Sequence, residues 1–391
     1  MKPGVDLSID LLGFRLKSPL ILSSGPAARD SSLLIRAAEA GAGAVVTPTI
    51  RLKPMVNPIP NLAAVCGGTS MLNSQGHSDV SWEDWVKVHV PKVKATGAVV
   101  VAKIGYSIEE VSALAPVVTD AGADILEIIA PTSELMPEMV RAAKSRSKET
   151  VPVVAKISGR WADRLGVAAR CVAAGADGLT AMDTVGPALA IDVRTGKPRL
   201  GGRTAAGRGF GWLSGRAIHS LAVATVAQLA LSHSVPIVGV GGVASAEDAL
   251  EMIMAGATAV GIQTAAALRG PGVFSEIIEG LNTLLSELGY KSVNEARGVA
   301  LPYIRGAEEE TIYTRRGVVL RPECCSTCYI AGACPVNCPY GLLTFESGGV
   351  KATETHGVDP KEYSVDLKDC SSCGLCASLC IGGGVAFEDP H

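Results

Sequence analysis

Eight short apolar runs recur between residues 19 and 264, separated by segments long enough to form helices. Most are apolar without interruption, as parallel strands covered on both faces are. Four follow nearly the same joint (AEAGAGA, TDAGADI, VAAGADG, IMAGATA), in which a glycine ends a helix shortly before a strand. The runs are PLILSSG (19–25), AVVTPT (44–49), AVVVAKIG (98–105), DILEIIAP (124–131), VPVVAKIS (151–158), DGLTAMDT (177–184), VPIVGVGG (235–242) and TAVGIQT (258–264).

Eight β-then-α units predict an α/β fold, a (β/α)8 TIM barrel, in preference to a doubly wound parallel sheet. Functional side chains then lie at the C-terminal ends of the strands. Two loops at that end are long, residues 51–79 and 185–215, and we expect both to cover an active site. The second is so rich in glycine that we expect no regular structure in it.

The cysteines are concentrated near the C-terminus, because nine of 11 lie from Cys324 to Cys380. A chain that is 48% hydrophobic builds its core without disulfides, so this concentration indicates metal ligands. We predict two domains: a barrel over residues 1–310, and a small α+β domain of the bacterial ferredoxin type over residues 311–391. The charged stretch GAEEETIYTRRG (306–317) is predicted to connect them.

Two cysteine runs have the spacing of iron–sulfur ligands. One is Cys-x2-Cys-x2-Cys-x3-Cys, and the other has three extra residues in its middle gap. Since the fourth cysteine of such a run ligates the other cluster, we predict two 4Fe-4S clusters. Structural zinc sites are the alternative, and Cys324 is an alternative first ligand. The predicted ligand sets are Cys325, Cys328, Cys334 and Cys380 for one cluster, and Cys370, Cys373, Cys376 and Cys338 for the other.

Glycine-rich segments follow the last two apolar runs, VGVGGVAS (238–245) and QTAAALRGPG (263–272), where many barrels bind phosphate. A tight turn is the alternative explanation. FMN is the simplest phosphate-bearing cofactor able to exchange electrons with the clusters, because it accepts one or two electrons. The chain has no dinucleotide fingerprint, so we expect NAD(P)H to act through another subunit or a soluble ferredoxin.

A net charge of −3 and a pI near 6.1 offer no general attraction to nucleic acid or anionic lipid. Residues 217–246 carry no Asp, Glu, Lys or Arg, yet their histidines, proline and glycines predict a helix, a turn and a buried strand instead of a membrane span. The opening residues lack the apolar run of a signal peptide. We therefore expect a cytoplasmic protein with no membrane partner.

On these motifs the chain resembles the FMN-containing dihydroorotate dehydrogenase family, and more closely the C-terminal half of dihydropyrimidine dehydrogenase. The resemblance implies a barrel that binds FMN, followed by a two-cluster module, and by analogy a homodimer. It covers essentially the whole chain. The shared motifs, in the family's order, are SPLILSSG, VNPIPN, MLNSQG, VPVVAKIS, GWLSG, PIVGVGG and GIQT.

The resemblance also implies cofactor contacts. Ser24 and Gly25 would meet the flavin ring region, with Thr49 and Asn73 near it. Lys156 would donate to the N1–O2 edge of the ring, or else neutralise a carboxylate inside the barrel. The positions that match the family's phosphate site are Ser214, Gly215, Gly241, Gly242, Gln263 and Thr264.

The substrate side departs from the family pattern. Pro48 stands where the family has a lysine, and Ile129 and Asp183 stand where it has asparagines, whereas Asn73 and Thr184 persist. Because hydrogen-bond specificity falls steeply when partners are lost, we expect a substrate other than orotate.

The family's cysteine or serine for proton transfer is absent from the loop after the fourth strand. Thr132 or Ser133 is nearest by alignment, although Ser133 or Glu134 would equally suit a helix cap. His77 is a candidate for acid–base work because the unperturbed pKa of histidine lies near neutrality, but a solvated loop histidine is the alternative explanation. Asp183 lies at a strand end, where a loop arginine, Arg194 or Arg203, would pair with it. The catalytic candidates are Asn73, His77, Thr132 and Asp183.

Taken together, these features predict an FMN and iron–sulfur oxidoreductase. It would add or remove two electrons at a C–C or C–N bond of a small molecule and exchange them with an external protein, either a ferredoxin or a FAD/NAD(P)H subunit. The alternative is an electron-transfer flavoprotein subunit without a substrate site of its own.

Overall fold

The computed structural model describes residues 4–204, 207–304, 318–321, 324, 338–340, 342–346, 349–352, 364–365, 370, 373–380 and 383–387. The chain forms two compact units, Met1–Ile304 and Arg305–His391.

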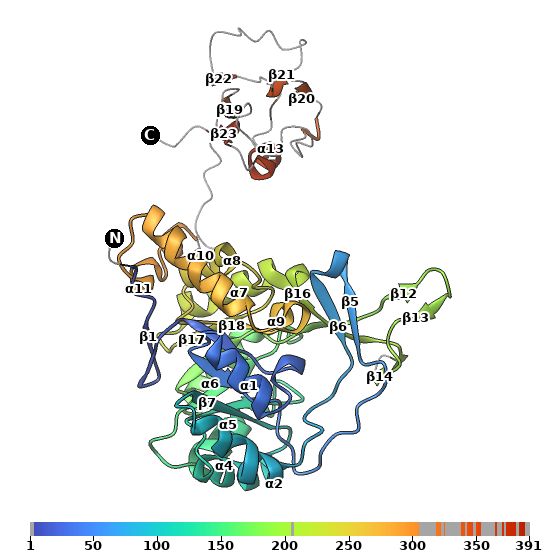
Figure 1. The fold of residues 1–391 in the computed structure, drawn as a ribbon, viewed down its shortest axis with the longest axis vertical. Helices are drawn as coiled ribbons and strands as arrows, with labels where there is room; N and C mark the ends of the chain where they lie inside the picture. Colours follow the sequence, from blue (N-terminus) through green and yellow to red (C-terminus); the bar gives the residue numbers. More distant parts are fainter. Residues whose placement is uncertain are drawn as a thin grey trace. The chain divides into compact units, whose positions relative to one another are not determined.

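Eight parallel strands of the first unit close into a barrel in chain order (Figure 1). Every strand falls within one of the eight apolar runs, so the predicted TIM barrel is confirmed. The strand side chains are almost entirely buried, and the ladder hydrogen bonds pair backbone N–H and C=O groups that would be costly to bury unpaired. The strands are β3 (Leu20–Leu22), β4 (Ala44–Val46), β7 (Val99–Gly105), β8 (Ile125–Ile129), β9 (Val153–Ile157), β10 (Gly178–Ala181), β17 (Ile237–Val240) and β18 (Ala259–Ile262).

Helices surround the barrel, and their ends carry the sequence signals expected of helix boundaries. The Ser107 hydroxyl accepts a hydrogen bond from the backbone N–H of Glu110 and so caps α4, while Ser245 and Asp248 form a capping box on α8. The glycines of the four repeated joints, Gly41, Gly122, Gly175 and Gly256, all have positive φ. The helices are α1 (Ser31–Glu39), α2 (Trp82–Asp84), α3 (Val90–Lys94), α4 (Ile108–Asp120), α5 (Met136–Arg146), α6 (Arg164–Ala173), α7 (His219–Ser232), α8 (Ala246–Met254), α9 (Thr264–Arg269), α10 (Val273–Glu287) and α11 (Val293–Ala296).

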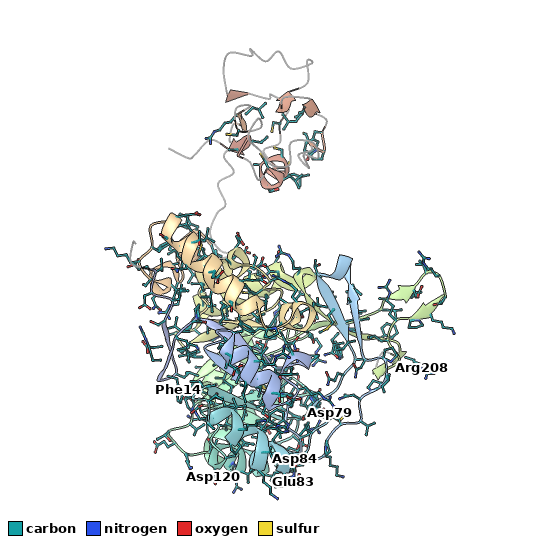
Figure 2. The ribbon with its side chains drawn as sticks, in the orientation of Figure 1. Phe14, Asp79, Glu83, Asp84, Asp120 and Arg208 are labelled. Atoms are coloured by element: carbon teal, nitrogen blue, oxygen red, sulfur yellow. The ribbon has the colours of Figure 1, made fainter. Side chains whose placement is uncertain are left out.

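Carboxylates occupy the outer surface of this helical layer, as Figure 2 shows for Asp84 and Asp120 on α2 and α4. The opposite helix faces pack on the strands through side chains such as Leu114, Val140 and Phe274, all fully buried. This two-layer core fixes the strand ends, and with them the side chains that line the barrel mouth.

The two long loops form a small antiparallel sheet of four strands in the order β11-β16-β6-β5. One loop supplies β5 (Leu62–Val65) and β6 (Ser70–Asn73), and the other supplies β11 (Val185–Ala188) and β16 (Gly211–Gly215). The expectation that the second loop has no regular structure is therefore wrong. Its glycines allow close strand approach, since a Cβ at Gly211 would lie 3.0 Å from the Asn73 carbonyl oxygen. Short hairpins extend the same loop: β12 (Ile191–Asp192), β13 (Lys197–Pro198), β14 (Arg203–Thr204) and β15 (Gly207–Arg208).

The described part of the second unit contains short strands and one short helix, α13 (Leu375–Leu379). Strand β19 (Val318–Leu320) pairs with both β22 (Ser364–Val365) and β23 (Val385–Phe387). Strands β20 (Leu343–Glu346) and β21 (Gly349–Ala352) form a separate antiparallel pair. The predicted connecting stretch, residues 306–317, lies outside the described residues.

Residues 217–246 form helix α7, a turn and the buried strand β17, as predicted. Across the described residues, no helix combines the length and the apolar composition that crossing a membrane requires.

Candidate active site

Two adjoining pockets open at the C-terminal ends of the barrel strands. We call them the glycine pocket, which contains Gly241 and Gly242, and the histidine pocket, which contains His77. They enclose about 580 and 990 Å³, open solvent included. The residues that line both pockets are Ser24, Gly25, Asn73, Asp183 and Thr184.

Backbone from three loops forms the wall of the glycine pocket. Gly215, Gly241 and Gly242 all have positive φ, and a Cβ at Gly242 would lie 2.6 Å from Cβ of His219. The Thr264 hydroxyl donates to that of Ser214 at 2.8 Å, so two more polar groups are held at the same wall. Exposed backbone and hydroxyl groups of this kind bind phosphate.

Gln263 gives an independent indication of a ligand in the glycine pocket. Its Nε2 is buried and has no hydrogen-bond partner among the described residues. A buried amide donor left unpaired is costly, so its position requires an acceptor that the described residues do not provide. The carbonyl and phosphate oxygens of FMN are acceptors of this type, and the pocket therefore fits this cofactor.

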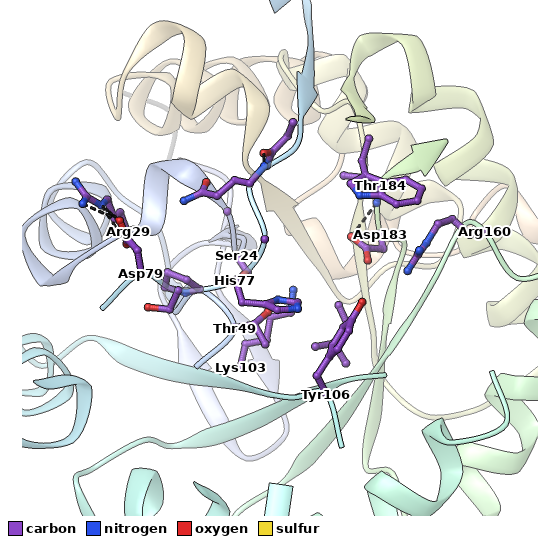
Figure 3. Close-up of a pocket in the computed structure, with 18 residues that line it drawn as sticks. Ser24, Arg29, Thr49, His77, Asp79, Lys103, Tyr106, Arg160, Asp183 and Thr184 are labelled. Atoms are coloured by element: carbon purple, nitrogen blue, oxygen red, sulfur yellow. Dashed lines mark hydrogen bonds and ion pairs between the residues drawn. The ribbon is translucent and has the colours of Figure 1, made fainter. Parts of the chain in front are cut away.

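The histidine pocket is lined mostly by polar side chains (Figure 3). His77 packs edge-on against Tyr106, with ring centroids 4.4 Å apart. The guanidinium of Arg160 lies 4.6 Å from the Trp212 ring centre, and the Arg29–Asp79 ion pair spans 2.8 Å. This mixture of cations, carboxylates and aromatic rings suits a small polar substrate.

A buried charge cluster lies beneath both pockets. Lys103 Nζ is 4.0 Å and Lys156 Nζ is 3.7 Å from the same Glu127 oxygen, Oε1. The other oxygen, Oε2, accepts a 2.8 Å hydrogen bond from Thr180. All three charged residues are at least 94% buried, and Lys103 and Glu127 are directly paired in register across β7 and β8. Lys156 thus combines the two roles considered for it, because it lines the glycine pocket and also neutralises a carboxylate inside the barrel.

Charges in this cluster shift the pKa values of its neighbours. Burial, followed by repulsion from Lys156, lowers the pKa of Lys103 to about 8. Burial alone would raise the pKa of Asp183, but the charges of Lys156 and Lys103 and the Thr184 N–H outweigh it, so this pKa is lowered. Asp183 is thus an anion that faces both pockets, and the cations that lower its pKa are Lys156, Lys103 and Arg160. Of its two expected partners, Arg194 is not among these cations, and the side chain of Arg203 lies outside the described part of the structure.

His77 lies in the pocket as predicted, but its ionisation differs from that of a solvated histidine. Burial, followed by the charges of Arg51 and Lys103, lowers its pKa to about 3. The ring is therefore neutral at physiological pH and can donate or accept a hydrogen bond there. As a proton donor it would be ineffective, because almost no protonated form exists near neutrality.

The structure brings together most of the predicted site residues. Thr49 lines the histidine pocket, and Ser214, Gln263 and Thr264 line the glycine pocket together with its glycines. Thr132 is not brought to the site: it is exposed, interacts with Glu134 and lines neither pocket. The Ser133 hydroxyl also bonds Glu134, and helix α5 begins after Leu135 without a side-chain cap.

Sequence reasoning missed several pocket residues, among them Lys103, Tyr106, Arg160 and Trp212, and the supporting Glu127. A signal for two of them was present. Lys103 and Glu127 are the single charged residues inside the apolar runs VVVAKIG and ILEII, a pattern that indicates paired charges in a barrel interior.

The cysteines of the predicted clusters are described only in part. Cys325, Cys328 and Cys334 lie outside the described residues. Burial raises the pKa of Cys376, and the nearby thiols of Cys370, Cys338 and Cys373 add to the increase. Within the described ranges, no three or more His, Cys, Asp or Glu side chains converge closely enough to hold a metal ion.

A barrel of this kind, with a pocket that fits FMN beside a polar substrate pocket, defines an FMN-dependent oxidoreductase. The sequence model of dihydroorotate dehydrogenase matches residues 6–285. The chain therefore belongs to the dihydroorotate dehydrogenase family.

Its relatives include catalytic subunits of dihydroorotate dehydrogenase B (NAD(+)). The protein from Pyrococcus abyssi is 36% identical over 310 residues, which are 75% of this chain and 99% of the relative. Those from Methanosarcina mazei and Methanocaldococcus jannaschii are 34% and 33% identical, covering 75% and 72% of this chain and 95% and 94% of theirs. Nearly the whole of each relative thus aligns with about three quarters of this chain.

Proposed function

We propose that the protein is an FMN and iron–sulfur oxidoreductase that transfers two electrons to or from a C–C or C–N bond of a small molecule other than dihydroorotate. The observation that carries this proposal is the junction of the two pockets, where Asn73, Asp183 and Thr184 face both. A substrate in the histidine pocket would there meet a cofactor in the glycine pocket, as two-electron transfer requires.

FMN would supply the electron chemistry of this reaction. The chain's own residues would bind and orient the cofactor. Gly215, Gly241 and Gly242 would hold the phosphate, and the Gln263 amide would donate a hydrogen bond to the cofactor. Lys156 brings a buried positive charge to the same pocket. Such a charge favours negative charge on a reduced cofactor.

The composition of the histidine pocket supports a substrate other than dihydroorotate. Pro48, Ile129 and Asp183 all line it, at positions where the resemblance implies a lysine and two asparagines. A carboxylate at position 183 would repel an anionic substrate that the family's asparagine would accept. Because the hydrogen-bonding groups of the pocket differ from those of the family, we expect its substrate to differ as well.

For the C-terminal unit we propose two 4Fe-4S clusters and residues 311–391 as their domain. Support comes from the spacing of the two cysteine runs. The clusters would exchange single electrons with an external protein, a ferredoxin or a subunit that uses NAD(P)H. The relatives' name, a catalytic subunit, is consistent with such a partner.

Anaerobic purification with flavin, iron and sulfide analysis tests the cofactors directly. The reduced protein is then mixed with dihydroorotate's product orotate and with a panel of pyrimidines, cyclic imides and enoates, and flavin absorbance is followed. We expect reoxidation by a panel member and none by orotate. Rapid orotate reduction would contradict the proposed specificity. Silence across the panel, with reoxidation by a partner protein, would instead favour an electron-transfer subunit without its own substrate.

A further inference from the structure

One carboxylate balances two buried ammonium groups that face different pockets. Lys103 lines the histidine pocket, Lys156 lines the glycine pocket, and Oε1 of Glu127 lies within 4.0 Å of both. Oε1 accepts no hydrogen bond among the described residues. Since Glu127 carries a single charge, the cluster holds one positive charge in excess when both lysines are protonated.

Lys103 is the group of the histidine pocket best suited to exchange a proton near neutral pH. The charged and titratable groups facing it are Glu127 on β8, Lys156 on β9, Asp183 after β10, and His77. His77 stays neutral, and the lowered pKa of Asp183 keeps it ionised. The pKa of Lys103, about 8, lies near the operating range of a general acid.

Negative charge that is added in the glycine pocket should raise the pKa of Lys103. Repulsion from Lys156 helps to lower the pKa of Lys103, and both lysines compete for Glu127. A negative charge beside Lys156 would offset that repulsion and leave more of the Glu127 attraction for Lys103. Reduction of a cofactor in the glycine pocket would therefore favour the protonated form of Lys103 in the histidine pocket.

We propose that reduction of the bound flavin stabilises the protonated form of Lys103, so that in alkaline solution Lys103 gains a proton together with the electrons, and that protonated Lys103 donates its proton to the substrate. This inference rests on the proposed function. In the reduction of a double bond, one carbon receives a hydride with two electrons from the cofactor, the π bond breaks, and the other carbon receives the ammonium proton of Lys103. The cofactor is oxidised, and the neutral amine regains a proton from water. The external electron donor restores the reduced cofactor.

The midpoint potential of the flavin, measured anaerobically from pH 6 to 10 on the full chain, tests the linkage without any substrate. Below pH 8 Lys103 is protonated in both redox states. Above it, reduction takes up one extra proton, so the potential should fall more steeply, by about 30 mV per tenfold change in proton activity. Lys103→Met and Lys103→Arg should both lose this change of slope, because neither side chain titrates in this range.

The two variants separate charge from proton exchange. Lys103→Arg keeps the positive charge, so its potential at pH 7 should stay near that of the wild type, whereas Lys103→Met should have a lower one. Lys148→Met, at an exposed lysine paired with Asp120, is the matched control and should behave as wild type. For any panel compound that reoxidises the wild type, Lys103→Met should slow reoxidation by about a hundredfold or more.

The results also separate this inference from the proposed function. A wild-type protein that binds no flavin contradicts the proposed function itself. A flavoprotein whose potential shows no change of slope near pH 8, or shows the same change after Lys103→Met, overturns the role of Lys103 alone. Retained flavin and a melting temperature no lower than that of the wild type show in each variant that the fold is intact.

Discussion

The side-chain amide of Gln263 lies so close to Gly25 that a Cβ at position 25 would be 2.5 Å from its Nε2. These residues follow β18 and β3, which are neighbouring strands in the closed barrel. The glycine thus makes room for an amide whose donor faces the pocket with no partner in the described chain. Position 25 controls where this amide points.

Gly25→Ala should weaken FMN binding by about tenfold. The new methyl group must displace the amide, and overpacking of this kind costs about 1–3 kcal/mol, of which 1.4 kcal/mol corresponds to a factor of ten. Flavin retained per protein, and FMN titration of the flavin-free protein, measure the effect. Gly272→Ala is the control, because a Cβ there meets nothing within 4 Å and φ is −55°. Equal FMN affinity in both variants would refute the assignment.

Lys103→Met should stabilise the barrel at pH 7. The drop in the Lys103 pKa from 10.5 to about 8 corresponds to about 3 kcal/mol of unfavourable burial at 1.36 kcal/mol per unit. The variant keeps the Glu127–Lys156 pair, so no buried carboxylate is left alone. We therefore expect its melting temperature to rise by several degrees.

The pH dependence of that gain follows from proton binding. Between pH 8 and 10.5 the unfolded chain binds more protons at Lys103 than the folded one, so wild-type stability rises with pH in this window. The variant lacks this rise. Its advantage should therefore shrink from pH 7 to pH 10, and a constant difference in melting temperature would show that Lys103 is not perturbed.

The His77 ring should not titrate between pH 5 and 8. Its pKa of about 3 reflects burial and the charges of Arg51 and Lys103. In a proton NMR titration, one of the six histidine signals should stay constant through this range, and His77→Gln should remove that signal. A midpoint near 6.5 for the removed signal would mean that the pocket is far wetter than the structure shows.

Cys376→Ser should remove about half of the bound iron and sulfide, since it deletes one ligand of one of two proposed clusters. Cys66→Ser is the matched control: this exposed cysteine lies on the loop between β5 and β6. Metal analysis of anaerobically purified protein distinguishes the two. Unchanged iron in Cys376→Ser, or zinc in place of iron, would contradict the cluster assignment.

The barrel could be predicted because each strand is a continuous apolar run that lies between two helix-forming segments. Such local sequence patterns are sufficient to indicate the strands and helices. The residues of the glycine pocket could also be predicted from the sequence, since Gly215, Gly241, Gly242 and Gln263 are adjacent to strand ends. Positions at strand ends converge whatever the loops do.

The histidine pocket was harder to predict because its residues converge only through tertiary structure. Trp212 faces the pocket because β16 pairs with β6, with Trp212 opposite Asn73, and no local pattern encodes that pairing. The shifted pKa values of His77 and Lys103 likewise depend on charges from several strands. The type of residue was visible in the sequence, but its ionisation was not.

The sheet over the barrel mouth joins two segments that are more than a hundred residues apart, with β6 of one hydrogen-bonded to β16 of the other. Neither segment can change length or register without misaligning its counterpart. A change of substrate preference in this protein should therefore require coordinated sequence changes in both segments. Grafting only one of the two segments into a relative would leave β6 or β16 without its matching partner strand.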